Sequence, residues 1–257
     1  MSSDLFVHER REQIVSLVRE CGRVSVAGLG EQFGVSQTTI RTDLDVLAQR
    51  GLLVRTRGGA VVPDRGDLEL DFHIRRSLNM QEKQRIGAAA AALIEDDDSI
   101  LLDASTTALA IVDHIKDRRR LNVITNGVLT AMALLDAPGI TVLMPGGFLY
   151  RDSASLVGRG NKEYVSQFIL QKGFFGAVGF TLEEGLTDVN NAEVAIKRDL
   201  IACTKRVIAV IDSSKWGKVG FASYASVERI DDVITDDGAP ADMVAALRGA
   251  GVKVTIV

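Results

Sequence analysis

Polar side chains that can bond DNA stand at helical spacing in the stretch VSQTTIRTDLDVL, residues 35–47. Ile40, Leu44 and Leu47 recur at i, i+4 and i+7, which predicts a helix with one apolar face. Ser36 can cap this helix by accepting a hydrogen bond from a free amide in its first turn. The side chains that we expect to contact base edges or phosphates are those of Ser36, Gln37, Thr38, Thr39, Arg41 and Thr42.

A second, shorter helix is predicted immediately before this one, over residues 26–33, with Gly34 as the break between them. Two helices joined by a glycine turn form the helix-turn-helix pattern, whose second helix enters the major groove of DNA. An ordinary helical hairpin is the alternative, because Ser and Thr at a helix start often act only as caps.

The residues after the second helix favour the DNA-binding interpretation. Residues 52–57 predict a strand, Gly58 and Gly59 a turn, and residues 60–62 a returning strand. Such a hairpin is the wing of a winged helix-turn-helix, and Arg55 and Arg57 stand where a wing would reach phosphates or the minor groove. The predicted DNA-contacting set also includes Ser25, in a brief strand over residues 22–26 that could pair with the wing.

Residues 24–59 resemble the DNA-binding end of the DeoR-type bacterial transcriptional regulators. That family has Thr-Ile-Arg-Arg-Asp-Leu in the second helix and His-Gly-Gly-Ala at the wing tip. Here Thr42 replaces the second Arg and Arg57 replaces the His. One change removes a phosphate contact and the other supplies one, so the family's operator sequence is not carried over.

The 257 residues and formal net charge of −4 fit two modest domains or one large one, and 46% hydrophobic residues indicate a globular protein. An acidic total does not exclude DNA binding, because the local charge decides. The excess of positive charge in residues 36–57 is small, because this stretch contains the arginines Arg41, Arg50, Arg55 and Arg57 and the aspartates Asp43 and Asp45. We therefore expect a homo-oligomer, a dimer or tetramer, that combines weak contacts on paired half-sites of double-stranded operator DNA.

The sequence predicts neither a metal site nor a cofactor. Cys21 and Cys203 lie far apart, and His8, His73 and His114 are scattered. No apolar signal core begins the chain, and the longest small-apolar run, residues 87–94, is too short to cross a bilayer. We expect a cytoplasmic protein without a membrane partner.

A change in composition predicts the domain organisation. Residues 63–67 combine Pro, Gly and charge, which is typical of a linker. We place a winged helix-turn-helix domain over residues 1–62, a linker and connector over 63–80, and an α/β domain over 81–257. The predicted helices cover residues 5–20, 81–95, 107–115, 128–135, 161–170, 193–204 and 241–250, and the predicted strands 99–103, 121–125, 140–144, 173–178, 206–212, 230–235 and 252–257. Short apolar strands separated by helices indicate a mostly parallel sheet buried on both faces.

Polar residues and glycines follow several of these strands. In open parallel sheets, ligands bind beyond the carboxyl ends of the strands. The candidate effector-binding residues are Asp103, Ser105, Thr106, Thr107, Asn126, Gly146, Gly147, Asp188, Glu193, Lys197 and Lys215. Each has a simpler explanation: Ser-Thr-Thr as a helix cap, Gly-Gly as a plain turn, and Glu193 with Lys197 as a solvated helix pair.

This half of the chain also resembles the DeoR family, whose sensor domain is similar to the ribose-5-phosphate isomerase and coenzyme A transferase type of α/β fold. The matching segments include Glu82-Lys83, residues 103–107, Gly146-Gly147 and residues 212–215. The resemblance implies a phosphorylated sugar or sugar-derived metabolite as effector. Its phosphate would lie near Ser105 to Thr107 or Gly146-Gly147, with Lys197 and Lys215 as counter-charges. Ala104-Ser105 departs from the Gly-Ser or Gly-Thr pair of many members.

The leading hypothesis is a DNA-binding transcriptional regulator, a repressor of a carbohydrate-metabolism operon that a phosphorylated sugar releases or modulates allosterically. The alternative is a sugar-phosphate isomerase or transferase-type enzyme with an accessory DNA-binding module, in which Asp103, Asp188, Glu193 and Lys215 would supply acid, base and phosphate clamp. A third hypothesis is an activator that responds to a partner protein.

Overall fold

The computed structural model describes residues 2–49, 52–61, 72–158 and 164–257. Contacts divide the chain into two compact units, Met1–Leu78 and Asn79–Val257. The linker predicted over residues 63–67 and Arg50 of the charge count lie outside the described residues, and the domain limits 1–62, 63–80 and 81–257 stay a prediction. No helix among the described residues is long and apolar enough to span a membrane.

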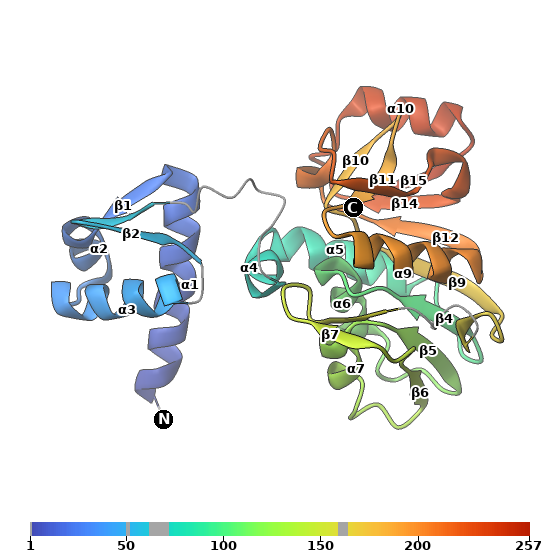
Figure 1. Ribbon diagram of the computed structural model, residues 1–257, viewed down its shortest axis with the longest axis horizontal. Helices are drawn as coiled ribbons and strands as arrows, with labels where there is room; N and C mark the ends of the chain where they lie inside the picture. The colour runs from blue at the N-terminus through green and yellow to red at the C-terminus, as the bar shows by residue number, and fades with distance from the viewer. Residues whose placement is uncertain (1, 50–51, 62–71, 159–163) are drawn as a thin grey trace. The chain divides into compact units, whose positions relative to one another are not determined.

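The first unit contains a helix-turn-helix with a wing (Figure 1). Its elements are α1 Ser2–Cys21, β1 Arg23–Ser25, α2 Val26–Phe33, α3 Gln37–Gln49, β2 Val54–Thr56, β3 Gly59–Val61 and, after the undescribed segment, α4 Phe72–Ser77. β3 pairs with both β2 and β1 in antiparallel register, so the expected pairing of the brief strand with the wing is confirmed. Gly34 ends α2 in the left-handed conformation at φ 62°, which suits a glycine.

The apolar faces of α1, α2 and α3 form one core. Its buried members are Ile14, Val15, Val18, Val26, Leu29, Ile40, Leu44, Leu47, Leu53 and Ala60. The predicted apolar face of the second helix is therefore confirmed. Gly59 lets β3 approach β1, because a Cβ there would overlap the Val24 carbonyl.

The second unit is built on a seven-stranded sheet in the order β15-β14-β12-β9-β4-β5-β6, with every neighbouring pair parallel. The strands are β4 Ser99–Leu102, β5 Leu121–Thr125, β6 Ile140–Leu143, β9 Leu170–Phe175, β12 Thr204–Val210, β14 Asp232–Thr235 and β15 Lys253–Ile256. The helices include α5 Met80–Ala91, α6 Thr106–Ile111, α7 Val128–Ala133, α9 Asn191–Ala202 and α10 Ala241–Gly249. The predicted parallel α/β architecture is thus confirmed.

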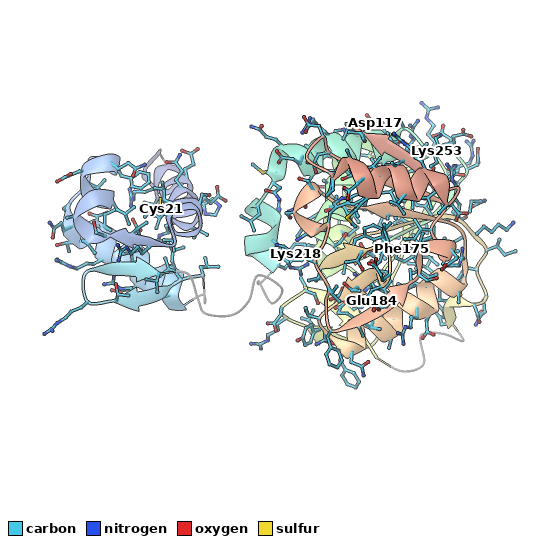
Figure 2. All side chains as sticks on the ribbon, turned by 90° about the horizontal axis from the view of Figure 1, so that it is seen from above. Cys21, Asp117, Phe175, Glu184, Lys218 and Lys253 are labelled. Carbon is cyan, nitrogen blue, oxygen red and sulfur yellow. The ribbon has the colours of Figure 1, made fainter. Side chains whose placement is uncertain are left out.

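Alternation along the strands creates an apolar layer on each face of the sheet. Ile100 and Leu102 of β4 join a core with Ile86 of α5 and Ile111 of α6. Leu101 points the other way and joins a core with the apolar side chains of α9 and α10. Both faces are therefore covered, as a parallel sheet requires. Side chains fill this interior, where Phe175 lies (Figure 2).

The structure departs from the predicted elements at several places; for example, the helix predicted over 193–204 ends at Ala202, and Thr204 begins β12. The helix predicted over 161–170 falls partly outside the described residues and is wrong over most of the rest, because residues 166–169 are not helical and Leu170 begins β9, three residues before the strand predicted at 173. The sequence analysis also missed an antiparallel sheet of β10 Gly179–Thr181, β11 Gly185–Asp188 and β13 Ala222–Ala225, and a hairpin of β7 Phe148–Tyr150 and β8 Ser155–Val157. Glycine and polar residues interrupt the strands of the antiparallel sheet, GFT, GLTD and ASYA, so no apolar run marks them in the sequence.

Candidate DNA-binding and effector sites

The recognition helix α3 exposes the residues expected to meet DNA. Gln37, Thr38, Arg41 and Thr42 are exposed, whereas Ile40 is fully buried. Arg41 Nη2 donates a hydrogen bond of 3.2 Å to Gln37 Oε1, and Thr42 Oγ1 donates one of 3.1 Å to the Thr38 carbonyl. The outward polar edge that a recognition helix needs is therefore present. Base or phosphate contact by each residue stays a prediction.

Two of the candidate serines serve as helix caps. Ser36 Oγ accepts a hydrogen bond from the Thr39 amide at 3.1 Å and lies 2.9 Å from Thr39 Oγ1. Ser25 Oγ accepts one from the Gly28 amide at 3.0 Å, at the start of α2. Both hydroxyls therefore act as caps in this structure, and DNA contact by Ser25 and Ser36 stays a prediction.

The two wing arginines differ in their surroundings. Arg55 Nε lies 2.8 Å from Asp45 Oδ1, and its Nη1 donates a hydrogen bond of 2.9 Å to the Gly59 carbonyl. Arg55 thus braces the wing against α3. Arg57 is exposed in the turn between β2 and β3 and stays the better candidate for a phosphate contact.

Sequence analysis missed an ionic contact between α1 and α3. Arg10 Nε and Arg11 Nε each lie 2.7 Å from a different oxygen of Asp43, which is buried. The position of Asp43 on the apolar side of α3, between Ile40 and Leu44, could have predicted this contact. Buried carboxylates require such partners.

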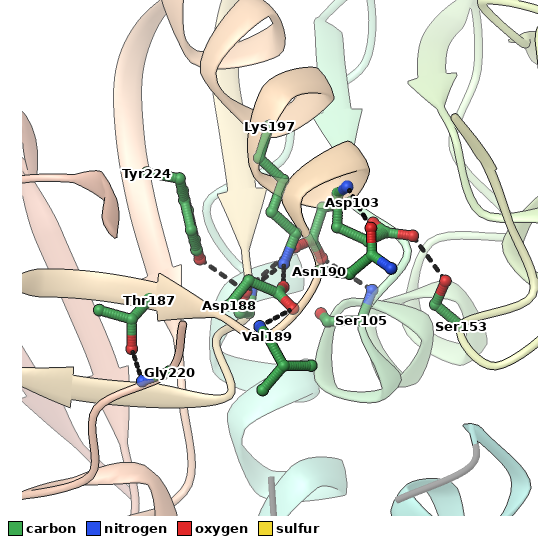
Figure 3. Close-up of polar contacts among 12 residues, drawn as sticks. Asp103, Ser105, Ser153, Thr187, Asp188, Val189, Asn190, Lys197, Gly220 and Tyr224 are labelled. Atoms are coloured by element: carbon green, nitrogen blue, oxygen red, sulfur yellow. Dashed lines mark hydrogen bonds and ion pairs between the residues drawn. The ribbon is translucent and has the colours of Figure 1, made fainter. Parts of the chain in front are cut away.

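In the second unit, Lys197 joins three elements that are distant in sequence. Lys197 Nζ lies 2.8 Å from Asp188 Oδ2 and 3.2 Å from Asp103 Oδ2, and donates a hydrogen bond of 2.9 Å to the Gly176 carbonyl. Figure 3 shows Lys197 reaching from α9 toward both carboxylates, with Tyr224 beside it. All three charged residues are buried. We name Asp103, Asp188 and Lys197 the carboxylate–lysine cluster.

The end of β4 is fixed by hydrogen bonds to Asp103. Its Oδ1 accepts from the Ser105 amide and its Oδ2 from the Gly176 amide, both at 3.0 Å. Ser105 Oγ accepts from the Ala108 amide at 3.1 Å and thereby caps α6. A Cβ at Gly176 would overlap the Ser105 side chain, so only glycine allows this approach of β9 to α6.

The electrostatics of the cluster keep Lys197 charged. Burial would lower the pKa of Lys197, but the negative charges around it, Asp188 foremost, raise it well above its ordinary value. Tyr224 donates a hydrogen bond of 2.6 Å to the Gly176 carbonyl, and its ring centroid lies 4.8 Å from Lys197 Nζ. Burial raises the pKa of the Tyr224 hydroxyl. The phenol and the ammonium therefore both stay protonated at neutral pH.

Glu193 does not form the solvated pair with Lys197 that its spacing permits. Both residues are buried, and Glu193 Oε1 instead accepts hydrogen bonds from Ser153 Oγ, at 2.5 Å, and from Ser155 Oγ. Burial raises the pKa of Glu193 and outweighs the Lys197 charge and the two serine hydrogen bonds, which lower it. The solvated-pair interpretation is thus wrong.

The remaining effector candidates lie at other strand ends. Asn126 follows β5 and is fully buried; its Oδ1 accepts no hydrogen bond from the described residues. Thr106 and Thr107 are buried in the first turn of α6. Gly146 and Gly147 have positive φ values of 74° and 116° after β6. Lys215 follows β12, where its charge lowers the pKa of Asp212. Ligand contact by each stays a prediction.

Sequence analysis missed several residues that complete these sites. They are Ser153, Ser155, Gly176, Asp212 and Tyr224. Ser153 lies in the turn of the unpredicted hairpin, Ser155 begins its strand β8, and Tyr224 lies in the unpredicted strand β13. Asp212 is the last residue of the strand predicted over 206–212, so its position at a strand end could have identified it as a candidate ligand contact.

Comparisons with known proteins agree with this two-part organisation. Residues 10–66 match the DeoR-like helix-turn-helix domain, and residues 78–237 match the DeoR C-terminal sensor domain. The HTH-type transcriptional regulator GolR of Listeria innocua serovar 6a is 35% identical over 252 residues, covering 98% of this chain and 99% of that protein. The putative aga operon transcriptional repressor of Escherichia coli O157:H7 is 36% identical over 251 residues, covering 97% and 93%.

A further relative and one solved structure complete the comparison. The glycerol-3-phosphate regulon repressor of Escherichia coli K12 is 30% identical over 239 residues, which cover 93% of this chain and 94% of that protein. The ribose 5-phosphate isomerase of Plasmodium falciparum is 12% identical, with a TM-score of 0.39 over 54% of each chain. That score is too low to compare their sites. The family matches and the full-length relatives show that the chain belongs to the DeoR family of DNA-binding transcriptional regulators.

Proposed function

We propose that this regulator represses a carbohydrate-metabolism operon and leaves its operator when a phosphorylated sugar binds the second unit. The observation that carries the proposal is the carboxylate–lysine cluster, whose Asp103 follows the parallel strand β4 at the edge of the sheet where ligands bind in such folds. Two relatives are named as repressors, of the aga operon and of the glycerol-3-phosphate regulon, which supports a role in carbohydrate use.

The chemistry of the cluster favours a polyhydroxyl ligand. Two carboxylates and one ammonium carry a net formal charge of −1, so the cluster attracts hydroxyl donors and disfavours a phosphate. Asn126 Oδ1, which accepts no hydrogen bond from the described residues, is a further acceptor for a sugar hydroxyl. The phosphate then belongs beside Lys215 or the amides of Gly146 and Gly147.

The ligand would act by shifting a two-state equilibrium. It needs only a higher affinity for the state that does not fit the operator, with a coupling of about 1–3 kcal/mol. Among the described residues of α3 and the wing, the exposed cations are Arg41 and Arg57. Recognition helices of a dimer or tetramer would therefore read two half-sites together, in the cytoplasm where the chromosome lies.

Binding without turnover is the function that the cluster supports best. Lys197 is held as an ammonium by Asp103 and Asp188, so it cannot act as a nucleophile or base at neutral pH. The isomerase-type alternative makes a different prediction: pure protein should convert ribose 5-phosphate, and Asp188→Asn should abolish that conversion.

A thermal-shift screen and a gel shift test the proposal together. The screen uses ribose 5-phosphate, glucose 6-phosphate, fructose 6-phosphate and glycerol 3-phosphate, since a bound ligand raises the melting temperature. The gel shift uses DNA from upstream of the chain's own gene and neighbouring carbohydrate genes. We expect specific binding that one of these compounds weakens. No specific DNA complex at low salt, or a complex that no sugar phosphate alters, would defeat the proposal.

A further inference from the structure

A second buried polar group lies where β12 ends. Asp212 is fully buried. Its Oδ1 accepts hydrogen bonds from Asn79 Nδ2 at 2.9 Å, from the Ser214 amide at 3.0 Å and from Ser214 Oγ. Its Oδ2 accepts no hydrogen bond from the described residues. A buried carboxylate oxygen gains from a hydrogen-bond donor, so Oδ2 is free to accept one from a bound molecule.

Positive charges keep Asp212 ionised. Burial would raise its pKa, but the charges of Lys215 and Lys83 and the hydrogen bonds from Ser214 and Asn79 outweigh burial and lower it. Lys83 is itself buried, on the first turn of α5. An ionised carboxylate only accepts hydrogen bonds, and the hydroxyls of a phosphorylated sugar are the groups of that ligand that can donate one to Oδ2.

Asp212 stands at the same edge of the sheet as the carboxylate–lysine cluster. Gly176 lies near both places, because a Cβ on it would overlap the Ser105 side chain and lie 3.5 Å from the Val210 carbonyl oxygen. Val210 is the last residue of β12, two positions before Asp212. Hydroxyls of one polyhydroxyl ligand can thus meet carboxylates from neighbouring strand ends.

Asn79 ties the same carboxylate to the start of the second unit. It is the first residue of that unit, directly after Leu78, which ends the first. Asn79 adopts the left-handed conformation at φ 49° and precedes α5, but its side chain forms no cap hydrogen bond to the helix. The amide reaches Asp212 instead, so Asp212 fixes the backbone where the chain enters the sensor domain.

We infer that Asp212 is a further effector contact and that it transmits occupancy to the chain entry at Asn79. Its Oδ2 accepts a hydroxyl of the phosphorylated sugar, while its Oδ1 holds the Asn79 amide. A donor at one oxygen withdraws charge from the other and weakens the hold on Asn79. This inference rests on the proposed sugar-phosphate function. Thermodynamic reciprocity requires that the Asn79 bond also changes the affinity for the sugar.

Three variants test the inference in the full-length protein. Asp212→Asn keeps the shape and removes the charge. Asn79→Gly removes the amide and keeps a residue that tolerates the left-handed backbone. Asp97→Gly is the matched control, because Asp97 also has a positive φ, 67°, and a side-chain hydrogen bond, but precedes β4 at the opposite edge of the sheet. The probes are the sugar phosphate with the largest thermal shift and inorganic phosphate, which carries no sugar hydroxyl.

For Asp212→Asn we expect the Kd of the sugar phosphate to rise about tenfold, because the complex loses one hydrogen bond to a charged group. The Kd of inorganic phosphate should change less than about twofold, because phosphate does not make this hydrogen bond. For Asn79→Gly we expect the ratio of operator affinities without and with the sugar phosphate to fall at least about fivefold. Asp97→Gly should match the wild type in both measurements.

Each contrary outcome has its own meaning. A sugar-phosphate Kd in Asp212→Asn equal to that of the wild type overturns the contact. If the operator-affinity ratio of Asn79→Gly equals that of the wild type, Asn79 does not transmit ligand binding to the chain entry. This measurement also tests the inference if Asp212→Asn fails to fold. A wild type that binds none of the sugar phosphates defeats the proposed function itself, and this inference with it.

Discussion

Arg10 on α1 donates its Nε to Asp43 on the recognition helix α3 across 2.7 Å, and Arg11 donates to the other carboxylate oxygen at the same distance. The side chains of both arginines are less than a quarter exposed. Two adjacent residues of one helix thus hold the helix that carries Arg41. The orientation of the DNA-reading surface therefore depends on charges that do not belong to that surface.

Replacing the buried acid should destabilise the first unit. We expect Asp43→Asn to lower its free energy of unfolding by about 1–3 kcal/mol, because two largely buried guanidinium groups lose their counter-charge. Urea unfolding followed by far-ultraviolet circular dichroism measures the loss. Asp45→Asn is the control: Asp45 is exposed and pairs with the half-buried Arg55, which keeps its hydrogen bond to the Gly59 carbonyl, so less than about 1 kcal/mol is expected. Equal effects of the two variants would contradict the role of Asp43.

Removing the exposed cation of the recognition helix should weaken operator binding. If Arg41 contacts a base edge, Arg41→Ala costs about 1–3 kcal/mol of specific affinity; if it contacts a phosphate, the dependence of affinity on salt becomes shallower by about one unit of slope. A salt titration of operator binding distinguishes these results. Lys205→Ala, an exposed cation in the second unit, serves as control. If Arg41→Ala binds the operator with the same affinity and the same salt dependence as the wild type, Arg41 does not contact DNA.

Much of the fold was predictable from sequence because its long elements carry periodic patterns. Ile40, Leu44 and Leu47 gave the recognition helix, and apolar runs gave the strands of the parallel sheet. The ends of those strands gave Asp103 and Asn126. The partners of these residues were not predictable, since Tyr224 and Ser155 come from short antiparallel strands without a pattern. Lys197 was found by its spacing from Glu193, but its true partners come from other elements.

Removing the central ammonium should destabilise the second unit. Lys197→Met removes the ammonium that lies between the buried carboxylates of Asp103 and Asp188, and we expect a loss of about 3–5 kcal/mol in the free energy of unfolding. Adding Asp188→Asn to Lys197→Met should recover part of that loss, because one uncompensated charge disappears. Urea unfolding of the wild type, both single variants and the double variant forms a double-mutant cycle. Strictly additive losses would show that Lys197 and Asp188 do not stabilise each other.

Glu193 should make stability fall as pH rises. Its folded pKa is raised, chiefly by burial, whereas the unfolded chain keeps the ordinary value of about 4.5. Between these two values the folded protein holds a proton that the unfolded chain has released. The contribution of Glu193 to the free energy of unfolding is therefore fully present below pH 4.5 and is lost as pH rises through the folded pKa.

Glu193→Gln tests this pH dependence, because glutamine stays neutral and its carbonyl can still accept hydrogen bonds from Ser153 and Ser155. Urea unfolding between pH 4 and pH 8 should show the variant gaining stability relative to the wild type as pH rises, by at most about 1.4 kcal/mol per pH unit. Glu184→Gln, at an exposed position, should run parallel to the wild type. A difference that shrinks with rising pH would mean that the serine hydrogen bonds and Lys197 outweigh burial, and that Glu193 is held as a carboxylate in the folded protein.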